Sequence, residues 1–80
     1  MILTVLNPST VIKYNIPESG FVIIKVFDVL GNEVMNLVNE KKETGSYEVS
    51  LNLSNLPSGL YLYQLKVNGF VETRKMMLMK

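Results

Sequence analysis

The sequence contains no cysteine, no histidine and no tryptophan. Without cysteine there is no disulfide bond, no thiolate zinc site and no cysteine nucleophile, although small exported domains often depend on disulfides. Without histidine, the side chain most often used as a general base or metal ligand is missing as well. We therefore expect no catalytic residue, no cofactor and no metal ion, and a fold that is held together by packing alone.

Chain length limits the protein to a single domain, which we place at residues 1–80. A domain of this size buries only about two-thirds of the surface that its unfolded chain exposes, so it builds one core. Seven carboxylates remain as possible acid–base groups. A glycosidase-like pair, however, needs a deep cleft that so small a domain hardly provides. The sequence predicts a non-enzymatic domain without a small-molecule substrate.

Charge of one sign and long apolar runs are also scarce. The eight basic and seven acidic residues nearly cancel, and the longest basic runs, Lys41-Lys42 and Arg74-Lys75, are pairs. Such a chain lacks the positive field that concentrates nucleic acid or anionic lipid. No apolar run approaches the roughly 20 residues that span a bilayer, and the first residues lack the features of a signal peptide. We expect no nucleic-acid binding and no membrane span, and any signal peptide belongs to a longer parent protein.

The strongest pattern that is present is the alternation of apolar and polar residues, clearest from Tyr47 to Leu53. A period of two places the apolar side chains on one face of a β-strand. Alternating or short apolar runs predict seven strands, at Ile2–Leu6, Val11–Ile16, Phe21–Val29, Glu33–Val38, Tyr47–Leu53, Leu60–Val67 and Phe70–Met79. Turn residues separate these runs at the short spacing of an antiparallel sandwich.

Two segments between Gly31 and the C-terminus need separate comment. The segment 33–42 also resembles a short helix, but its brevity and the nearby Gly31 and Gly45 favour a strand. Asn68-Gly69 is the strongest turn signal, because a type I′ turn needs positive φ at both central residues. It predicts a hairpin of the last two strands. With no long helix to supply crossovers, the sequence predicts an all-β, seven-stranded antiparallel sandwich.

Two side chains have specific predicted roles in turns. Asp28 precedes Gly31 by three residues, where its carboxylate accepts backbone N–H groups and the glycine adopts a left-handed conformation. A calcium site of Asp28 and Glu33 is the alternative. Tyr61 follows a Pro/Gly corner, which is where β-sandwiches place a tyrosine whose hydroxyl bonds to the preceding loop. We expect Tyr61 to fix that corner.

The aromatic residues and the methionine-rich end each have a structural and a binding interpretation. Tyr14, Tyr47, Tyr61 and Tyr63 share the apolar faces of their strands and are predicted to pack in the core. With Phe21, Phe27 and Phe70 they are alternatively a platform for carbohydrate. The end of the chain, Met76-Met77-Leu78-Met79-Lys80, predicts a last strand packed into the sheet, a soft recognition surface, or an edge for strand addition by a partner.

A series of motifs runs in order along the chain. It comprises Asn7-Pro8-Ser9-Thr10, Ile12-x-Tyr14-x-Ile16-Pro17-x-x-Gly20, Val26-Phe27-Asp28-Val29-Leu30-Gly31-x-Glu33-Val34, Leu37-Val38, Gly45-x-Tyr47, Leu56-x-x-Gly59-x-Tyr61 and Gly69-Phe70-x-Glu72-Thr73-Arg74-Lys75-Met76. Over residues 7–80 this series resembles the type A C-terminal sorting domain of type IX secretion cargo proteins. The resemblance implies an immunoglobulin-like β-sandwich at the end of a parent protein, recognised by type IX proteins at the outer membrane of Bacteroidetes-type bacteria.

The resemblance also implies roles for particular positions. The recurrent structural features of the family fall on Pro8, Asp28, Gly31, Gly45, Leu56, Gly59 and Tyr61. The final strand, which the family implicates in targeting, corresponds to Lys75, Met76, Met77, Leu78, Met79 and Lys80. The implied route is transit through the periplasm followed by release or attachment at the cell surface. The alternative function is a structural or adhesive immunoglobulin-like module, as in flagellar hook-capping proteins, whose Pro-x-x-Gly and Asp-x-x-Gly stretches look similar.

Overall fold

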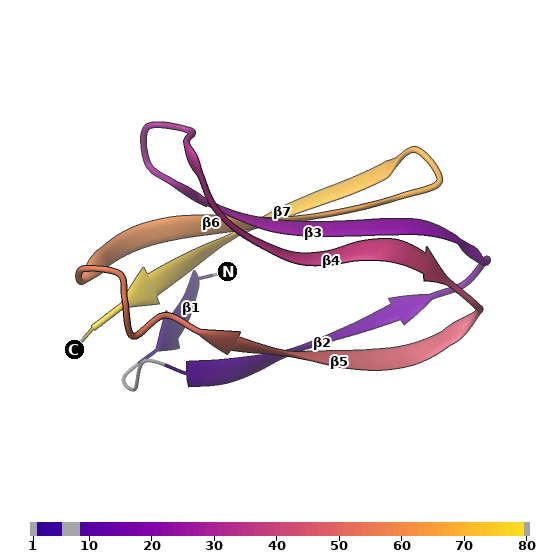
Figure 1. Cartoon of the computed structure of the whole chain (residues 1–80), viewed down its shortest axis with the longest axis horizontal. Coiled ribbons are helices and arrows are strands. Elements are labelled where there is room, and N and C mark those ends of the chain that lie inside the picture. Colours follow the sequence, from indigo (N-terminus) through magenta and orange to yellow (C-terminus); the bar gives the residue numbers. More distant parts are fainter. Residues whose placement is uncertain (1, 6–8, 80) are drawn as a thin grey trace.

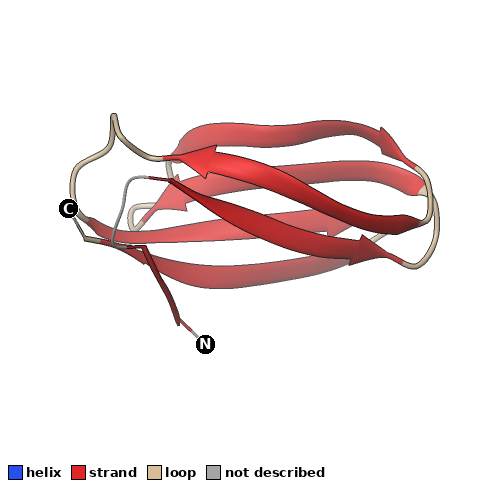
Figure 2. Cartoon of the chain, turned by 90° about the horizontal axis from the view of Figure 1, so that it is seen from below, coloured by secondary structure: helices blue, strands red, loops and turns tan. Residues whose placement is uncertain are grey.

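Every element of secondary structure in the described part of the chain is a β-strand, and the strands form two sheets. The computed structural model describes the backbone of residues 2–5 and 9–79 and the side chains of residues 9–79. The strands are β1 (Ile2–Val5), β2 (Ser9–Ile16), β3 (Gly20–Asp28), β4 (Glu33–Lys42), β5 (Gly45–Asn52), β6 (Gly59–Val67) and β7 (Phe70–Leu78). A five-stranded sheet in the order β1-β7-β6-β3-β4 faces a two-stranded sheet of β2 and β5 (Figures 1 and 2).

Six of these strands pair antiparallel, and β1 does not. Strand β2 pairs with β5, β3 pairs with β4 and β6, and β6 pairs with β7, all antiparallel. The short β1 runs parallel to β7. The predicted all-β sandwich is confirmed, whereas the prediction of seven antiparallel strands is wrong. A short connection forces two consecutive strands of one sheet to run antiparallel. This constraint does not apply to β1, because β2, the next strand, lies in the other sheet and β1 pairs with the distant β7.

Strand β4 explains why its sequence resembles a helix. The register between β3 and β4 shifts twice, so that Val34 and Leu37 are extra residues without a partner in β3. Such β-bulges disturb the period of two. Val34, Met35 and Leu37 therefore all pack against the core, and Val38 is buried. The predicted strand is confirmed, and its irregular apolar spacing comes from the two bulges.

The hairpin at Asn68-Gly69 also holds a second turn in place. Asn68 has a φ of 50° and Gly69 a φ of 81°, as a type I′ turn requires, and Val67 pairs with Phe70. The side-chain amide of Asn68 donates to the carbonyl oxygen of Ser19 at 3.1 Å. A Cβ atom on Gly20 would collide with this side chain. A larger residue at position 20 would therefore displace the Asn68 side chain from the position in which it binds Ser19.

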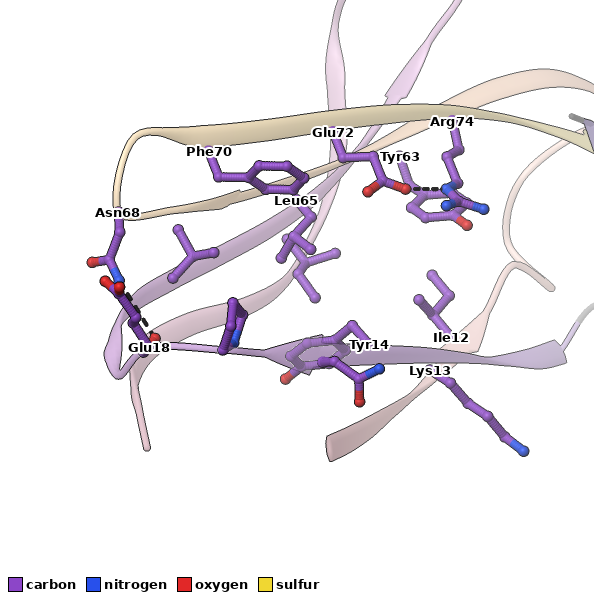
Figure 3. A pocket seen from close by; sticks show the side chains of 14 residues that line it. Ile12, Lys13, Tyr14, Glu18, Tyr63, Leu65, Asn68, Phe70, Glu72 and Arg74 are labelled. Carbon is purple, nitrogen blue, oxygen red and sulfur yellow. Dashed lines mark hydrogen bonds and ion pairs between the residues drawn. The ribbon is translucent and has the colours of Figure 1, made fainter. Parts of the chain in front are cut away.

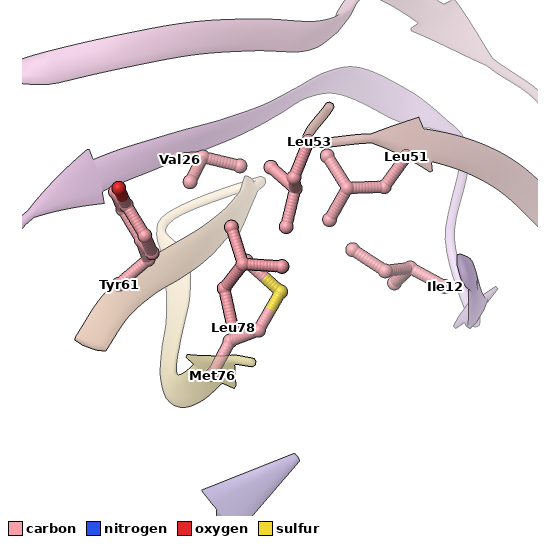
Figure 4. Packing of buried hydrophobic residues seen from close by; sticks show 7 residues of the cluster. All are labelled: Ile12, Val26, Leu51, Leu53, Tyr61, Met76 and Leu78. Carbon is pink, nitrogen blue, oxygen red and sulfur yellow. The ribbon is translucent and has the colours of Figure 1, made fainter. Parts of the chain in front are cut away.

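The core consists of two neighbouring groups of buried side chains between the sheets. One contains Ile12, Val26, Leu51, Leu53, Tyr61, Met76 and Leu78 (Figure 4). The other contains Tyr14, Ile16, Val22, Ile24, Val38 and Val67. Almost all of these residues occupy alternate positions of their strands, as the period of two predicts. Strand β7 contributes two residues to the first group, so the end of the chain is part of the core.

Replacing Leu78 by alanine tests this contribution. Leu78 is 1% exposed, and its truncation is expected to lower the free energy of unfolding by about 2–5 kcal/mol in urea denaturation. Met79→Ala is the matched control, because Met79 is 49% exposed and should lose less than about 0.5 kcal/mol. Equal losses for the two variants would show that the last strand does not pack as described.

Candidate functional site

The final strand is the first candidate site, and it is not an edge of the sheet. Strand β7 lies between β1 and β6, with β1 pairing along Lys75 to Leu78. Both sides of its backbone are therefore occupied at the end of the strand. A partner that adds a strand to β7 would first have to displace β1. The predicted edge for strand addition is wrong for this part of β7.

The side chains of the final strand point in two directions. Met76 and Leu78 are 0% and 1% exposed and face the core. Lys75 is exposed and Met77 half-buried, and they point to the outer side of the five-stranded sheet. Met79 follows the strand and is exposed, while Lys80 lies outside the described residues. The segment predicted to act in targeting is thus divided between buried residues and residues that a partner can reach.

The turn after β3 is built on one carboxylate. The Asp28 carboxylate accepts the backbone N–H groups of Leu30 and Asn32, each at 3.0 Å, and the Asn32 side-chain amide at 3.3 Å. Gly31 donates its N–H to the Asp28 carbonyl oxygen and has a φ of 89°. The predicted role of both residues in the turn is confirmed. The alternative of a calcium site gains no support, because Asp28 binds the turn and Glu33 pairs with Lys25 at 2.9 Å.

These hydrogen bonds make the turn sensitive to acid. The backbone N–H of Asn32 is the main cause that lowers the pKa of Asp28 below its ordinary value of 3.8. A lowered pKa in the folded state means that the unfolded chain binds the proton more tightly, so the carboxylate stabilises the fold above pH 3.8. Part of the stability is therefore lost as the pH falls below that value.

Asp28→Asn isolates this dependence on charge. The variant keeps an oxygen that accepts the N–H groups but has no proton to gain. We expect the wild-type protein to be the more stable of the two at neutral pH. The difference should shrink in thermal unfolding as the pH is lowered through the acidic range below 3.8. A difference that stays constant down to the lowest pH would contradict the assignment.

Tyr61 forms the corner between β5 and β6. The residue is 5% exposed, and its hydroxyl donates to the carbonyl oxygen of Pro57 at 2.7 Å. This is the geometry of a tyrosine corner, in which a buried ring connects the strand to the loop before it. The predicted role of Tyr61 is confirmed.

Tyr61→Phe removes this hydrogen bond and leaves the ring. We expect the free energy of unfolding to fall by about 0.5–1.5 kcal/mol, because a partly buried hydrogen bond is lost. Tyr47→Phe is the matched control, since the Tyr47 hydroxyl also donates to a backbone carbonyl, that of Glu43 at 2.6 Å, but in an exposed position. Water replaces the exposed bond, so the control should lose less in chemical denaturation. A loss of less than a few tenths of a kcal/mol for Tyr61→Phe would show that the hydrogen bond of the corner does not stabilise the fold.

The other positions that the family resemblance singled out lie at strand starts, in the loop before β6, or outside the described residues. Gly45 and Gly59 are the first residues of β5 and β6. Leu56 donates its N–H to the carbonyl oxygen of Leu53 at 3.0 Å and packs against the core. Pro8 lies outside the described residues.

Several of these positions meet at one end of the five-stranded sheet. Asp28 pairs with Tyr61 across β3 and β6, and Tyr61 pairs with Met76 across β6 and β7. Gly59 pairs with Leu78 two rows further along the same strands. The turn after β3 and the described end of the chain lie at the same end of the molecule in Figure 1. Gly45 lies apart from this group, opposite the end of β2.

A cleft of about 530 Å³ lies between β2 and the strands β6 and β7, which the sequence did not predict. Figure 3 shows Tyr14 on one side of it and Tyr63 and Phe70 on the other. The Glu72 carboxylate in its wall pairs with Arg74. Among the described residues no group of histidine, cysteine and carboxylate side chains is placed to hold a metal ion. The cleft exists because the two-stranded sheet is narrower than the sheet it covers.

The aromatic residues do not form one platform. Tyr14 and Tyr61 are buried, and Tyr47 and Tyr63 pack against the core, as predicted. The ring of Tyr14 stacks on that of Tyr47 with 5.6 Å between the centroids. Phe21 and Phe70 are exposed but stand on opposite faces of the five-stranded sheet, because Phe70 pairs with the buried Val67 whereas Phe21 precedes the buried Val22. This placement gives carbohydrate stacking no support.

Within the described ranges no helix is long and apolar enough to cross a membrane. The fold and the placement of its turns define a β-sandwich module whose last strand is part of the core. The description "secretion system C-terminal sorting domain" belongs to a family model that matches residues 7–79. The chain belongs to this family, the C-terminal sorting domains of type IX secretion. It is not a family of enzymes.

Two solved structures with TM-scores above 0.6 support the fold. An uncharacterized protein from Bacillus anthracis str. Ames matches with a TM-score of 0.71 and 10% identity, over 99% of this chain and 76% of that chain. The CBM51-2 and INT domains of Clostridium perfringens ZmpB match with a TM-score of 0.62 and 20% identity, over 99% of this chain and 17% of that one. The Ig1 domain of mouse SynCAM 2 has a TM-score of 0.48 and 12% identity, over 96% and 87%. No curated protein sequence matches the chain.

Proposed function

We propose that this domain directs a parent protein across the outer membrane through the type IX secretion machinery. The single observation that carries the proposal is the family match over residues 7–79. Residues 1–80 act as one unit at the end of the parent, without catalysis. Outer-membrane proteins of the machinery recognise the folded domain in the periplasm, and the parent then reaches the cell surface or the medium of a Bacteroidetes-type bacterium.

The immunoglobulin-like class is part of the proposal and draws support from the strand order. In immunoglobulin domains strands B and E pair in one sheet, and C, F and G pair in the other. Here β2 and β5 correspond to B and E, and the order β7-β6-β3 corresponds to G-F-C. Strand β4 then extends the second sheet beyond C, as in variable-type domains. The tyrosine corner at the start of β6, the counterpart of F, fits the same scheme.

The buried and the accessible residues of the final strand are suited to different roles in targeting. Met76 and Leu78 are buried, so they act by keeping β7 in the sheet. Lys75, Met77 and Met79 are accessible to a receptor. A deletion of Lys75 to Lys80 removes both kinds of residue at once. Its effect on export is therefore expected to combine loss of the fold with loss of recognition.

A reporter fusion tests the proposed function. Residues 1–80 are attached to the C-terminus of a periplasmic reporter and expressed in a type IX-competent strain and in a strain that lacks the translocon. We expect the reporter in the medium or on the surface of the competent strain only. The fusion without Lys75 to Lys80 should remain in the periplasm. Export in both strains, or export without the tail, would overturn the proposal and favour a structural or adhesive module.

A further inference from the structure

The outer face of the five-stranded sheet carries apolar side chains that belong to neither group of the core. Val22, Ile24 and Val26 face inward along β3, so the residues between them face outward. The same alternation in β6 and β7 places further apolar residues on this side. The full set is Phe21, Ile23, Phe27, Leu60, Leu62, Val71 and Met77. An antiparallel sheet that faces water normally presents polar residues there.

The register of the strands divides these residues into two apolar groups. At one end of the sheet Phe27 pairs with Leu62, and Leu60 pairs with Met77. At the other end lie Phe21, which is 54% exposed, Val71, which is 52% exposed, and Ile23.

A polar row separates the two groups. Lys25 pairs with Gln64, and Gln64 pairs with Thr73. The Gln64 side-chain amide donates to the Thr73 hydroxyl at 3.1 Å. The outer face therefore combines two apolar areas with a central row of groups that form directed hydrogen bonds.

Lysines accompany both apolar groups. Lys75 pairs with Leu62, Lys66 lies between Ile23 and Val71, and Lys41 pairs with Phe21. The carboxylate on this face, Glu33, pairs with Lys25. Within the described residues, Lys41, Lys66 and Lys75 form no ion pair. The face is thus positively charged, although the whole chain has a net charge of only +1.

The outer face of the two-stranded sheet is different in kind. Inward-facing Ile12, Tyr14 and Leu51 leave Ser9, Val11, Lys13, Asn15, Ser46, Glu48, Ser50 and Asn52 on its outer side. Lys13 and Glu48 are opposite each other, so their charges cancel. This second face is polar and neutral, with Val11 as its one apolar residue. The apolar and cationic character of the first face is therefore not a general property of the surface.

We propose that the outer face of the five-stranded sheet docks on a protein whose surface is apolar and carries carboxylates. The inference rests on the proposed sorting function and names the surface through which it acts. The three exposed lysines, Lys41, Lys66 and Lys75, match an acidic surface, and complementary charge guides association and fixes orientation. The apolar groups supply the area that a specific interface buries. Lys75 and Met77 place two accessible residues of the final strand on this face.

The central polar row favours a protein over a lipid bilayer. A bilayer accepts apolar side chains and attracts lysine. The amide of Gln64 and the hydroxyl of Thr73, however, would be pressed against lipid with few partners, which is costly. A protein surface offers hydrogen-bonding groups at matching positions. An acidic protein surface therefore accommodates the apolar groups, the lysines and the polar row together better than a bilayer does.

Charge reversal tests the docking face. Lys66→Glu, Lys75→Glu and the double variant are titrated with the purified outer-membrane receptor of the type IX machinery, and each is assayed for export of the fused reporter. Lys13→Glu is the matched control, because it reverses an exposed lysine on the other sheet. We expect the double variant to bind about tenfold more weakly or worse, with an unchanged melting temperature and reduced export. The control should bind and be exported like the wild type.

Two further measurements make the outcome decisive. The affinity of the wild-type domain should fall as salt is raised, because salt screens exposed charges; an affinity independent of salt would overturn the proposal. Binding to phosphatidylglycerol vesicles in place of the receptor would also overturn it. If the wild type binds and is exported and the double variant does the same, the docking face is wrong and the sorting function stands. If the wild type is not exported, the sorting function itself fails.

Discussion

The packing of Met76 and Leu78 against residues of the opposite sheet is the interaction on which the rest of the structure depends. The two-stranded sheet consists only of β2 and β5, and a two-stranded ribbon is marginally stable by itself. Its Leu51 and the following Leu53 join the core group that the end of β7 completes (Figure 4). Without that strand, the apolar side of β2 and β5 would lack part of its cover. The same strand carries the residues that we propose for targeting, so the proposal couples folding to recognition.

Alternation along β7 separates these two tasks. Neighbouring residues point to opposite faces of a strand, so Met76 and Leu78 enter the core while Lys75 and Met77 remain accessible. A methionine is compatible with the inner position because its flexible side chain fills irregular space. The inner positions require apolar volume, and the outer positions are free to vary with the partner. A change in sorting without a change in stability is therefore possible at the outer positions.

Much of the fold was predictable from the sequence, because its signals act over short distances. The Asn68-Gly69 hairpin, the turn at Asp28 and the corner at Tyr61 each depend on a few residues close together in the chain. What escaped prediction depends on contacts between distant segments. The parallel pairing of β1 with β7 and the bond from Asn68 to Ser19 have no local signature. In β4 the two bulges interrupt the alternation of apolar and polar residues, so the apolar spacing of this strand resembles that of a short helix.

The distribution of charge gives the same lesson for the candidate site. Lys41, Lys66 and Lys75 are scattered along the sequence and indicate no basic patch. The register of β4 on β3, β3 on β6 and β6 on β7 brings the three lysines to one face of the sheet. The net charge of the sequence therefore underestimates the positive electrostatic field at this face of the folded domain.

The central position of the last strand has a consequence for synthesis. Strand β7 joins β1 to β6, so the order of the five-stranded sheet is complete only when the residues after Gly69 are present. A polypeptide that ends prematurely, or that is still emerging from the ribosome, lacks the strand that connects its earliest residues to the rest of the sheet. Such a chain cannot complete the five-stranded sheet. Completion of the sheet thus requires that synthesis has passed Leu78, and products that terminate before β7 lack the complete sheet.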